Sequence, residues 1–358
     1  MGRVLSRLIA TVWRPTPRSL RGWALASVIA NAVIISTGAA VRLSSSGLGC
    51  PDWPTCTKSS VVAAHSVGQT TLNTWIEFSN RLLTYPLVVI AGLTFIAFLR
   101  YYRASGRARK DLVWLSAVLP LGVIAQAVVG GLLVLTKLNP ALDAAHFLLS
   151  TAIILTSAVV LHARATVLTE TGLAAAAAGP PPPPPARADL RVLAGVLTGI
   201  TALMLAAGTV VTGTGPLAGT TIDSHGHRTT VPRFHFSLES VTQLHADIGW
   251  FIAALAVALV IGLRFAGGSS RTVRLGWIVL AGIGLQGVIG YLQYFNHLPA
   301  GLVWVHVSMA VIVWIAVVRL YLSTGTGLPR PARRAVPGDD RAAAEPAAAP
   351  PPVKTTLL

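Results

Sequence analysis

The stretch LGWIVLAGIGLQGVIGYLQYFNHLPAGLVWVHVSMAVIVWIAVV, from Leu275 to Val318, contains no Lys, Arg, Asp or Glu. An α-helix rises about 1.5 Å per residue, so about 20 residues cross the roughly 30 Å hydrocarbon core of a bilayer. The stretch is too long for one crossing, and the segment from Asn296 to Gly301 supplies a polar turn near its middle. It therefore predicts two membrane-spanning helices joined in a tight hairpin.

The same criterion predicts an all-α integral membrane protein with eight spans. The composition, 53% hydrophobic and 11% charged with a mean hydropathy of +0.66, excludes soluble globular classes, in which about a quarter of residues are charged. The first span is longer than a signal-peptide core, so we expect it to stay as a helix. The predicted spans are Gly22 to Val41, Trp75 to Leu99, Leu112 to Leu135, Ala144 to Ala163, Val192 to Thr212, Ser240 to Leu263, Leu275 to Phe295 and Leu302 to Leu322.

The basic residues are divided unevenly between the two sides of this arrangement. The chain has 28 Lys and Arg against 12 Asp and Glu, a net charge of +16. Of the 28, 22 fall on the side of the two termini, and cytoplasmic loops are the ones that collect Lys and Arg. This split predicts a multi-pass plasma membrane protein with both termini in the cytoplasm. It also removes the reason to expect a nucleic-acid partner.

The two halves of the chain resemble each other. AQAVVGGLL from Ala125 aligns with LQGVIGYLQ from Leu285, and the same offset of 160 residues pairs Gln126 with Gln286 and His146 with His306. Four spans separate equivalent helices, which predicts two repeated four-helix bundles of the same orientation. The expected parts are a cytoplasmic basic N-terminus (1–21), an N-terminal bundle (22–163) with an outer loop carrying the cysteines (42–74), an Ala/Pro-rich, extended or disordered cytoplasmic linker (164–191), a C-terminal bundle (192–322) and a disordered cytoplasmic tail (323–358).

Three histidines, His146, His245 and His306, lie a few residues inside the outer ends of predicted spans. Ionisable residues in a bilayer are costly and point to function. Two histidines on neighbouring helices of one bundle can clamp a flat haem between neutral imidazole nitrogens, and His245 and His306 satisfy that arrangement. The alternative is that each histidine only hydrogen-bonds a neighbouring helix.

The N-terminal half differs at the position equivalent to His245, where it has Asn80. An amide is a poor iron ligand, so His146 is the one obvious axial ligand of that half. Glu77 lies about one helical turn from Asn80 on the same face. A singly ligated iron beside a carboxylate suits a reacting centre, whereas a symmetric pair suits electron transfer. The alternative for Glu77 is an ion pair with Arg81 at the i, i+4 spacing.

The chain has two cysteines, Cys50 and Cys56, both in the outer loop. On the oxidising side of a membrane such a pair can form a small-loop disulfide, and one near a redox site can be reactive. Two cysteines without a nearby fixed histidine make an incomplete zinc site.

These residues resemble the haem A synthase family of the bacterial eight-helix kind. The resemblance rests on TGAAVRLSSSGLGCPDWPTC from Thr37, EFSNRL from Glu77, GTVVTGTGPLAG from Gly208 and the three histidines in their helices. It implies an oxidoreductase that converts the C8 methyl of haem O to the formyl group of haem A for cytochrome oxidase.

The resemblance also implies roles for individual residues. His245 and His306 would ligate a cofactor haem b, and His146 would ligate the iron of the substrate haem O. Glu77 would be the catalytic acidic residue near that substrate, and Cys50 and Cys56 would form the loop disulfide. Many members have His where Asn80 stands, so two-histidine ligation of the substrate cannot be transferred. The residues expected to support these sites are Arg81, Gln126 and Gln286.

Two other functions fit parts of the pattern. A b-type cytochrome passing electrons from quinol would need a second complete pair of ligands, which Asn80 argues against. A transporter would carry polar groups near the midplane, whereas the ionisable groups here lie near the outer ends. The partners expected for a synthase are haem O, a haem O synthase, membrane lipid and an electron acceptor of unknown identity, with a homo-oligomer left open.

Overall fold

The computed structural model describes the chain except residues 1, 64–69, 179–185, 223–227, 267 and 326–358. The described chain is nearly all helical, with one short antiparallel hairpin. Its elements are α1 (Gly2–Trp13), α2 (Pro17–Leu43), α3 (Thr71–Leu82), α4 (Thr84–Ala104), α5 (Lys110–Leu135), α6 (Pro140–Leu148), the π-helix η1 (Leu149–Leu155), α7 (Thr156–Ala178), α8 (Ala188–Thr214), the 3-10 turn η2 (Pro216–Ala218), β1 (Thr220–Ile222), β2 (Arg228–Thr230), α9 (Leu238–Phe265), α10 (Ser270–Phe295) and α11 (Ala300–Thr324).

The prediction of eight membrane spans is confirmed, because eight helical segments in the described chain are long and apolar enough to cross a bilayer. The helices extend beyond the predicted spans, since an apolar run marks the membrane-crossing part and capping residues set the helix ends. Thr16, for example, caps α2 with its side chain and so starts that helix at Pro17.

Two spans are interrupted in ways that hydropathy does not reveal. The second consists of α3 and α4, which meet at Leu83 just before Pro86. Proline lacks the N–H that would bond to Leu82, and its ring crowds that carbonyl. The fourth consists of α6, η1 and α7 in succession.

The structure adds a helix to the expected N-terminal segment and differs from the expected linker in one part. The basic N-terminal segment contains helix α1, whose Val12 is buried and whose Trp13 carbonyl accepts a hydrogen bond from Arg100 at 2.9 Å. The alanine run of the expected extended or disordered linker is the end of α7, consistent with the high helix propensity of alanine. The proline run at 179–185 and the tail from 326 lie outside the described residues.

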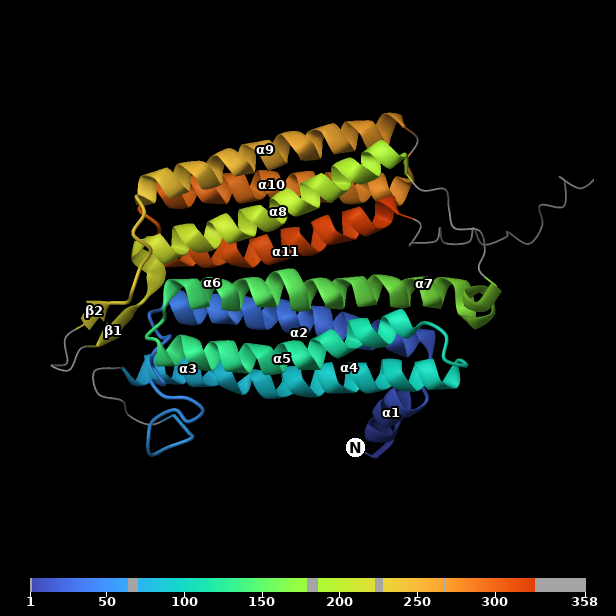
Figure 1. Cartoon of the computed structure of the whole chain (residues 1–358), viewed down its shortest axis with the longest axis horizontal. Helices are drawn as coiled ribbons and strands as arrows, with labels where there is room; N and C mark the ends of the chain where they lie inside the picture. The colour runs from blue at the N-terminus through green and yellow to red at the C-terminus, as the bar shows by residue number, and fades with distance from the viewer. Residues whose placement is uncertain (1, 64–69, 179–185, 223–227, 267, 326–358) are drawn as a thin grey trace, which may run out of the picture.

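The long helices form two groups of four packed side by side (Figure 1). One group contains α2, α4, α5 and the α6–α7 span, and the other contains α8 to α11. Helix α11 packs against α2 and α7, and α8 packs against α6, so these five helices form the interface between the groups. The start of α2 and the end of α11 lie at one end of the molecule, and α3 with the β-hairpin lies at the other, which we call the outer end.

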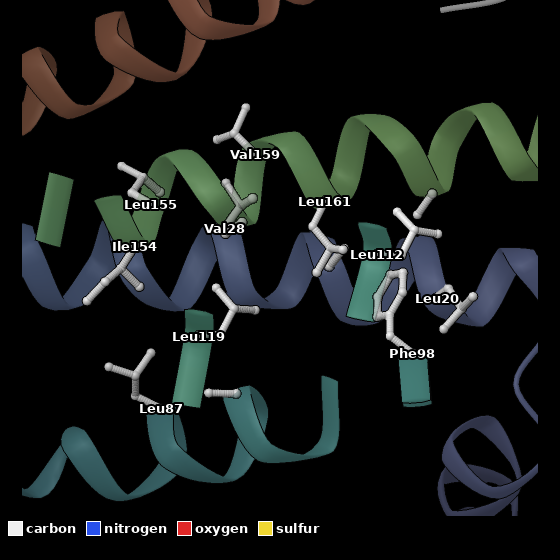
Figure 2. Packing of buried hydrophobic residues seen from close by; sticks show 14 of the residues in the cluster. Leu20, Val28, Leu87, Phe98, Leu112, Leu119, Ile154, Leu155, Val159 and Leu161 are labelled. Carbon is white, nitrogen blue, oxygen red and sulfur yellow. The ribbon is translucent and has the colours of Figure 1, made fainter. Parts of the chain in front are cut away.

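The core of the first group consists of apolar side chains from all its long helices. Figure 2 shows Leu20 of α2, Phe98 of α4, Leu112 of α5 and Leu161 of α7 meeting between the ribbons. Val311, Trp314 and Val318 of α11 belong to the same buried cluster. Side chains of α11 therefore extend the core of the first group into part of the interface between the groups.

Tryptophans of α11 also join the groups by hydrogen bonds. The Trp314 indole N–H lies 3.0 Å from both the Thr151 carbonyl in η1 and the Thr156 hydroxyl. The Trp304 indole N–H donates to the Ser36 carbonyl of α2 at 2.9 Å. A π-helix leaves carbonyls short of their usual partners, and Trp314 supplies a donor for one of them.

Candidate functional site

One large cavity extends across the interface between the two helix groups. Its volume of about 2010 Å³ exceeds the roughly 300–1,000 Å³ typical of a site for one drug-sized ligand, so it has room for more than one large molecule. Helices of both groups line it, and most of the lining is apolar. The polar side chains singled out by the sequence all lie on its wall: Glu77, Asn80, Arg81, Gln126, His146, His245, Gln286 and His306.

The three histidines reach the cavity because each lies near the start of a helix that begins at the outer end. Those helices are α6, α9 and α11. The Asn139 side chain accepts hydrogen bonds from the Ala141 and Leu142 N–H groups of α6, and the Ser237 side chain accepts one from the Ser240 N–H of α9. These caps fix where the helices begin and hence the depth of His146 and His245.

Each histidine ring lies against a glycine of a neighbouring helix. A Cβ atom at Gly130 would lie 3.1 Å from Cε1 of His146, one at Gly208 3.3 Å from Cε1 of His245, and one at Gly290 3.5 Å from Cε1 of His306. Asn80 lies near Gly38 in a similar way, since a Cβ atom at Gly38 would lie 4.0 Å from Nδ2 of Asn80. The absence of side chains at these glycines leaves room for the rings at the wall of the cavity.

The hydrogen bonds around the histidines also recur in both halves. Gln126 donates to the His146 carbonyl at 2.8 Å, and Gln286 donates to the His306 carbonyl at 3.1 Å. Together with the contacts of Gly130 and Gly290, these bonds repeat at the offset of 160 residues. Interpretation of the halves as repeats stays a prediction, which this recurrence supports.

The buried polar atoms indicate that the histidines serve a ligand. Nδ1 of His146, His245 and His306 is buried without a hydrogen-bond partner within the described chain. The Oδ1 atom of Asn80 is likewise buried without a hydrogen-bond partner within the described chain. Such atoms are costly and uncommon in native proteins, and a bound ion or group often supplies the missing partner.

The pair His245 and His306 fits an iron porphyrin. The two ring centres are 6.4 Å apart, with the ring planes at 59°. An iron held midway needs each ligating nitrogen about 2 Å from the metal, and the nitrogen lies about 1 Å from its ring centre, so about 6 Å between centres is required. Since a porphyrin supplies four nitrogens itself, two side chains complete the coordination.

The first group offers a different ligand set. His146 and Asn80 line the cavity there, and no second histidine of this group does so within the part of the chain that the structure describes. Within the described chain, no set of three or more His, Cys, Asp or Glu side chains is placed to hold a metal ion alone. The donors therefore suit a metal that brings its own macrocycle, held by one axial imidazole in this half.

Glu77 and Arg81 clamp the outer loop against α3. Glu77 is 5% exposed; its Oε1 lies 2.6 Å from Nη2 of Arg81, and its Oε2 accepts from the Cys50 N–H at 2.7 Å. The ion pair considered as an alternative from the sequence is therefore present. The predicted disulfide between Cys50 and Cys56 is also present, and both cysteines are buried.

Sequence reasoning missed two contacts that shape the site. Trp53, within the disulfide loop, packs so closely on Gly131 that a Cβ there would lie 2.5 Å from its indole. Arg42 at the end of α2 forms an ion pair with Asp143 of α6, and both line the cavity. The sequence signal for the first contact was the glycine pair at 130–131. The signal for the second was the charge of Arg42 inside the motif that begins at Thr37.

The fold and the site define a multi-pass membrane protein with an apolar, histidine-lined cavity shared by two helix groups. The chain belongs to the cytochrome oxidase assembly protein family, whose model matches residues 21–318.

Relatives over part of the chain carry the name heme A synthase. The protein of Geobacillus thermodenitrificans is 28% identical over 120 residues, 33% of this chain and 34% of that protein. The Geobacillus kaustophilus protein is 30% identical over 117 residues, 32% of this chain and 33% of that protein. The Lysinibacillus sphaericus protein is 28% identical over 133 residues, 37% of this chain and 40% of that protein. The chain thus matches about a third of the length of these relatives.

Proposed function

We propose that this protein is a haem A synthase, which oxidises the C8 methyl of haem O to a formyl group for cytochrome oxidase. The observation that carries the proposal is the asymmetric histidine arrangement in one cavity, a facing pair in one helix group and a single histidine in the other. Membership of the cytochrome oxidase assembly family and the names of the relatives support it.

In this proposal the two helix groups have different tasks. His245 and His306 hold a b-type haem, which supplies one-electron redox chemistry when bound. His146 holds the iron of haem O, and the wall of the cavity orients the methyl group and keeps bulk water away. With water as the oxygen source, conversion of the methyl to a formyl group releases four protons and four electrons, so the site needs an electron acceptor.

Glu77 is the acidic group that we propose acts on the substrate. It lines the cavity, and its carboxylate is held in place by Arg81 and the Cys50 N–H. A fixed negative charge stabilises positive charge that develops at the methyl carbon, and a carboxylate can also accept a proton there.

The location follows from the charge distribution as part of the same proposal. With 22 of the 28 basic residues on the side of the termini, we place the termini in the cytoplasm and the disulfide loop outside the plasma membrane. Because haem O is poorly soluble, a haem O synthase in the same membrane is the partner we propose for its delivery.

Extraction of the bound haems tests the proposed function. The full chain is purified after expression with and without a haem O synthase, and its haems are separated by chromatography. Haem b with haem A, or with its hydroxylated precursor, supports the synthase. Haem b alone, at two per chain, supports a b-type cytochrome that passes electrons and contradicts the proposal, as does a protein without haem.

We predict that Glu77→Gln lowers the conversion of haem O about 100-fold or more, in the range typical of a lost acid–base group. Glutamine keeps one oxygen that can accept the Cys50 N–H, so the change removes the charge and the ion pair with Arg81 but keeps that contact with the loop. Haem O retained per chain is measured beside haem A formed, and retention should stay within about twofold, since the iron ligand is untouched.

The matched control is Glu239→Gln, which neutralises an exposed carboxylate that lines the cavity on α9. It should convert haem O at the rate of the unaltered protein. Equal losses in the two variants would assign the effect to the charge of the cavity as a whole and would contradict a specific role for Glu77.

The glycines that face the histidines give a second prediction. We expect Gly130→Ala to lower retention of haem O, because the new methyl lies 3.1 Å from His146 and pushes the ring. We expect Gly290→Ala to leave the haem b content unchanged, because 3.5 Å from His306 is an ordinary contact. Haem content by pyridine haemochrome spectra measures both, and equal behaviour of the variants would contradict the packing argument.

A further inference from the structure

Among the described residues, two cationic side chains other than histidine line the cavity, Arg42 and Arg81. An arginine carries five N–H donors, and the protein itself occupies all five of Arg81. Nε and one N–H of Nη2 bond to Glu77, and the other N–H of Nη2 bonds to the Cys50 carbonyl. Nη1 bonds to the carbonyls of Asp52 and Thr55. Arg81 therefore has no donor left for a ligand.

Arg42 differs because part of its guanidinium is unused. Its Nη1 pairs with Asp143 of α6 and lies 3.5 Å from the Thr212 hydroxyl of α8. Its Nε is buried and has no hydrogen-bond partner within the described chain. A buried guanidinium N–H without a partner is costly, so this donor points to a group that the cavity receives.

The position of Arg42 relative to His146 indicates which part of a ligand it meets. Asp143 precedes His146 by three residues on α6, so the two side chains lie on one face of the helix. At 1.5 Å per residue the separation is about 4.5 Å along the axis, toward the outer end. Arg42, paired with Asp143, therefore lies beyond the histidine, where the edge of a flat ligand held by that histidine would emerge.

We propose that Arg42 binds an ionised carboxylate on the edge of the porphyrin held by His146, namely a propionate. This inference rests on the proposed function, since it assumes a haem at His146. Haems carry two propionates that are charged at neutral pH, and a carboxylate in an apolar cavity needs a cationic donor. The planar guanidinium offers separate edges, so Arg42 keeps Asp143 on Nη1 while Nε donates to the propionate.

A comparison of free and esterified haem tests the proposal. The purified full chain in detergent is titrated with haem O and with haem O dimethyl ester, whose carboxylates are neutral and cannot form an ion pair. We expect the unaltered protein to bind the free acid about 10- to 100-fold more tightly, the range of a charge-assisted hydrogen bond. Arg42→Gln should lose this preference and bind both forms like the ester, and Arg42→Lys should retain part of it.

Arg233→Gln is the matched control. Arg233 also lies near the outer end and also has a buried Nε without a partner, but it is not among the residues that line the cavity. It should keep the full preference for the free acid. The haem b content of each variant, which depends on the other helix group, shows whether the variant is folded.

The outcomes separate this proposal from the proposed function. Equal affinity of the unaltered protein for the acid and the ester, or an undiminished preference in folded Arg42→Gln, overturns the role of Arg42 and leaves the synthase standing. A loss of preference in Arg233→Gln as large as that in Arg42→Gln also overturns it. The effect would then come from the overall positive charge near the outer end and not from Arg42. Failure of the unaltered protein to bind either form overturns both proposals.

Discussion

Replacing His306 or His245 with alanine should remove the haem b from the protein, with the bound fraction falling about tenfold or more in each single variant. The two rings are 6.4 Å apart, and each contributes one of the two axial bonds that the proposed iron makes to the protein. Loss of one ring leaves the other imidazole opposite an empty position in an apolar cavity. Absorption spectra of the purified variants, with haem b quantified after extraction, measure the result.

The control for this prediction is His297→Asn. His297 lies in the turn between α10 and α11 and is not among the residues that line the cavity. Its φ of 59° is in the left-handed region, where asparagine is tolerated better than most residues. This variant should keep its haem b. Retention of haem b by both His245→Ala and His306→Ala would show that the pair is not the ligand set.

The membrane architecture could be predicted from the sequence because hydropathy is a local property. The apolar runs around Leu275 to Val318 report the spans directly, and the turn at Asn296 separates them without any tertiary information. The break at Leu83 and the π-helix after His146 could not be predicted in this way. The break depends on Pro86, which hydropathy does not weigh, and the π-helix accepts a hydrogen bond from Trp314, which comes from the other half of the chain.

In the candidate site too, features that depend on local sequence could be predicted, and contacts between distant residues could not. The histidines and Glu77 were found because ionisable residues stand out in apolar spans. The ion pair between Glu77 and Arg81 could be predicted from its i, i+4 spacing. The contacts of Arg81 with the disulfide loop could not, because they join residues about 30 positions apart. The pair Arg42 and Asp143 joins two helices through charges about 100 positions apart, and no spacing rule connects them.

Substitutions of His146 and Asn80 should differ strongly in their effect on the retention of haem O. We expect His146→Ala to abolish retention of haem O, while Asn80→Ala lowers it only a few-fold. Among the described residues, His146 is the one histidine of the first helix group that lines the cavity, and its ring lies against Gly130. Asn80 has a buried, unpartnered Oδ1 and can contribute a hydrogen bond to a water or group near the iron, but an amide is a weak iron ligand.

The measurement is the haem O content of each variant after expression with a haem O synthase, with haem b in the same sample as the internal reference. Asn80→His provides a sharper test, because it adds an imidazole at the position that the predicted repeat pairs with His245. The haem iron in this variant should become six-coordinate and low-spin, and its absorption spectrum should report that change. Equal losses of haem O in His146→Ala and Asn80→Ala would contradict single-histidine ligation, because they would mean that the amide holds the substrate as firmly as the imidazole does.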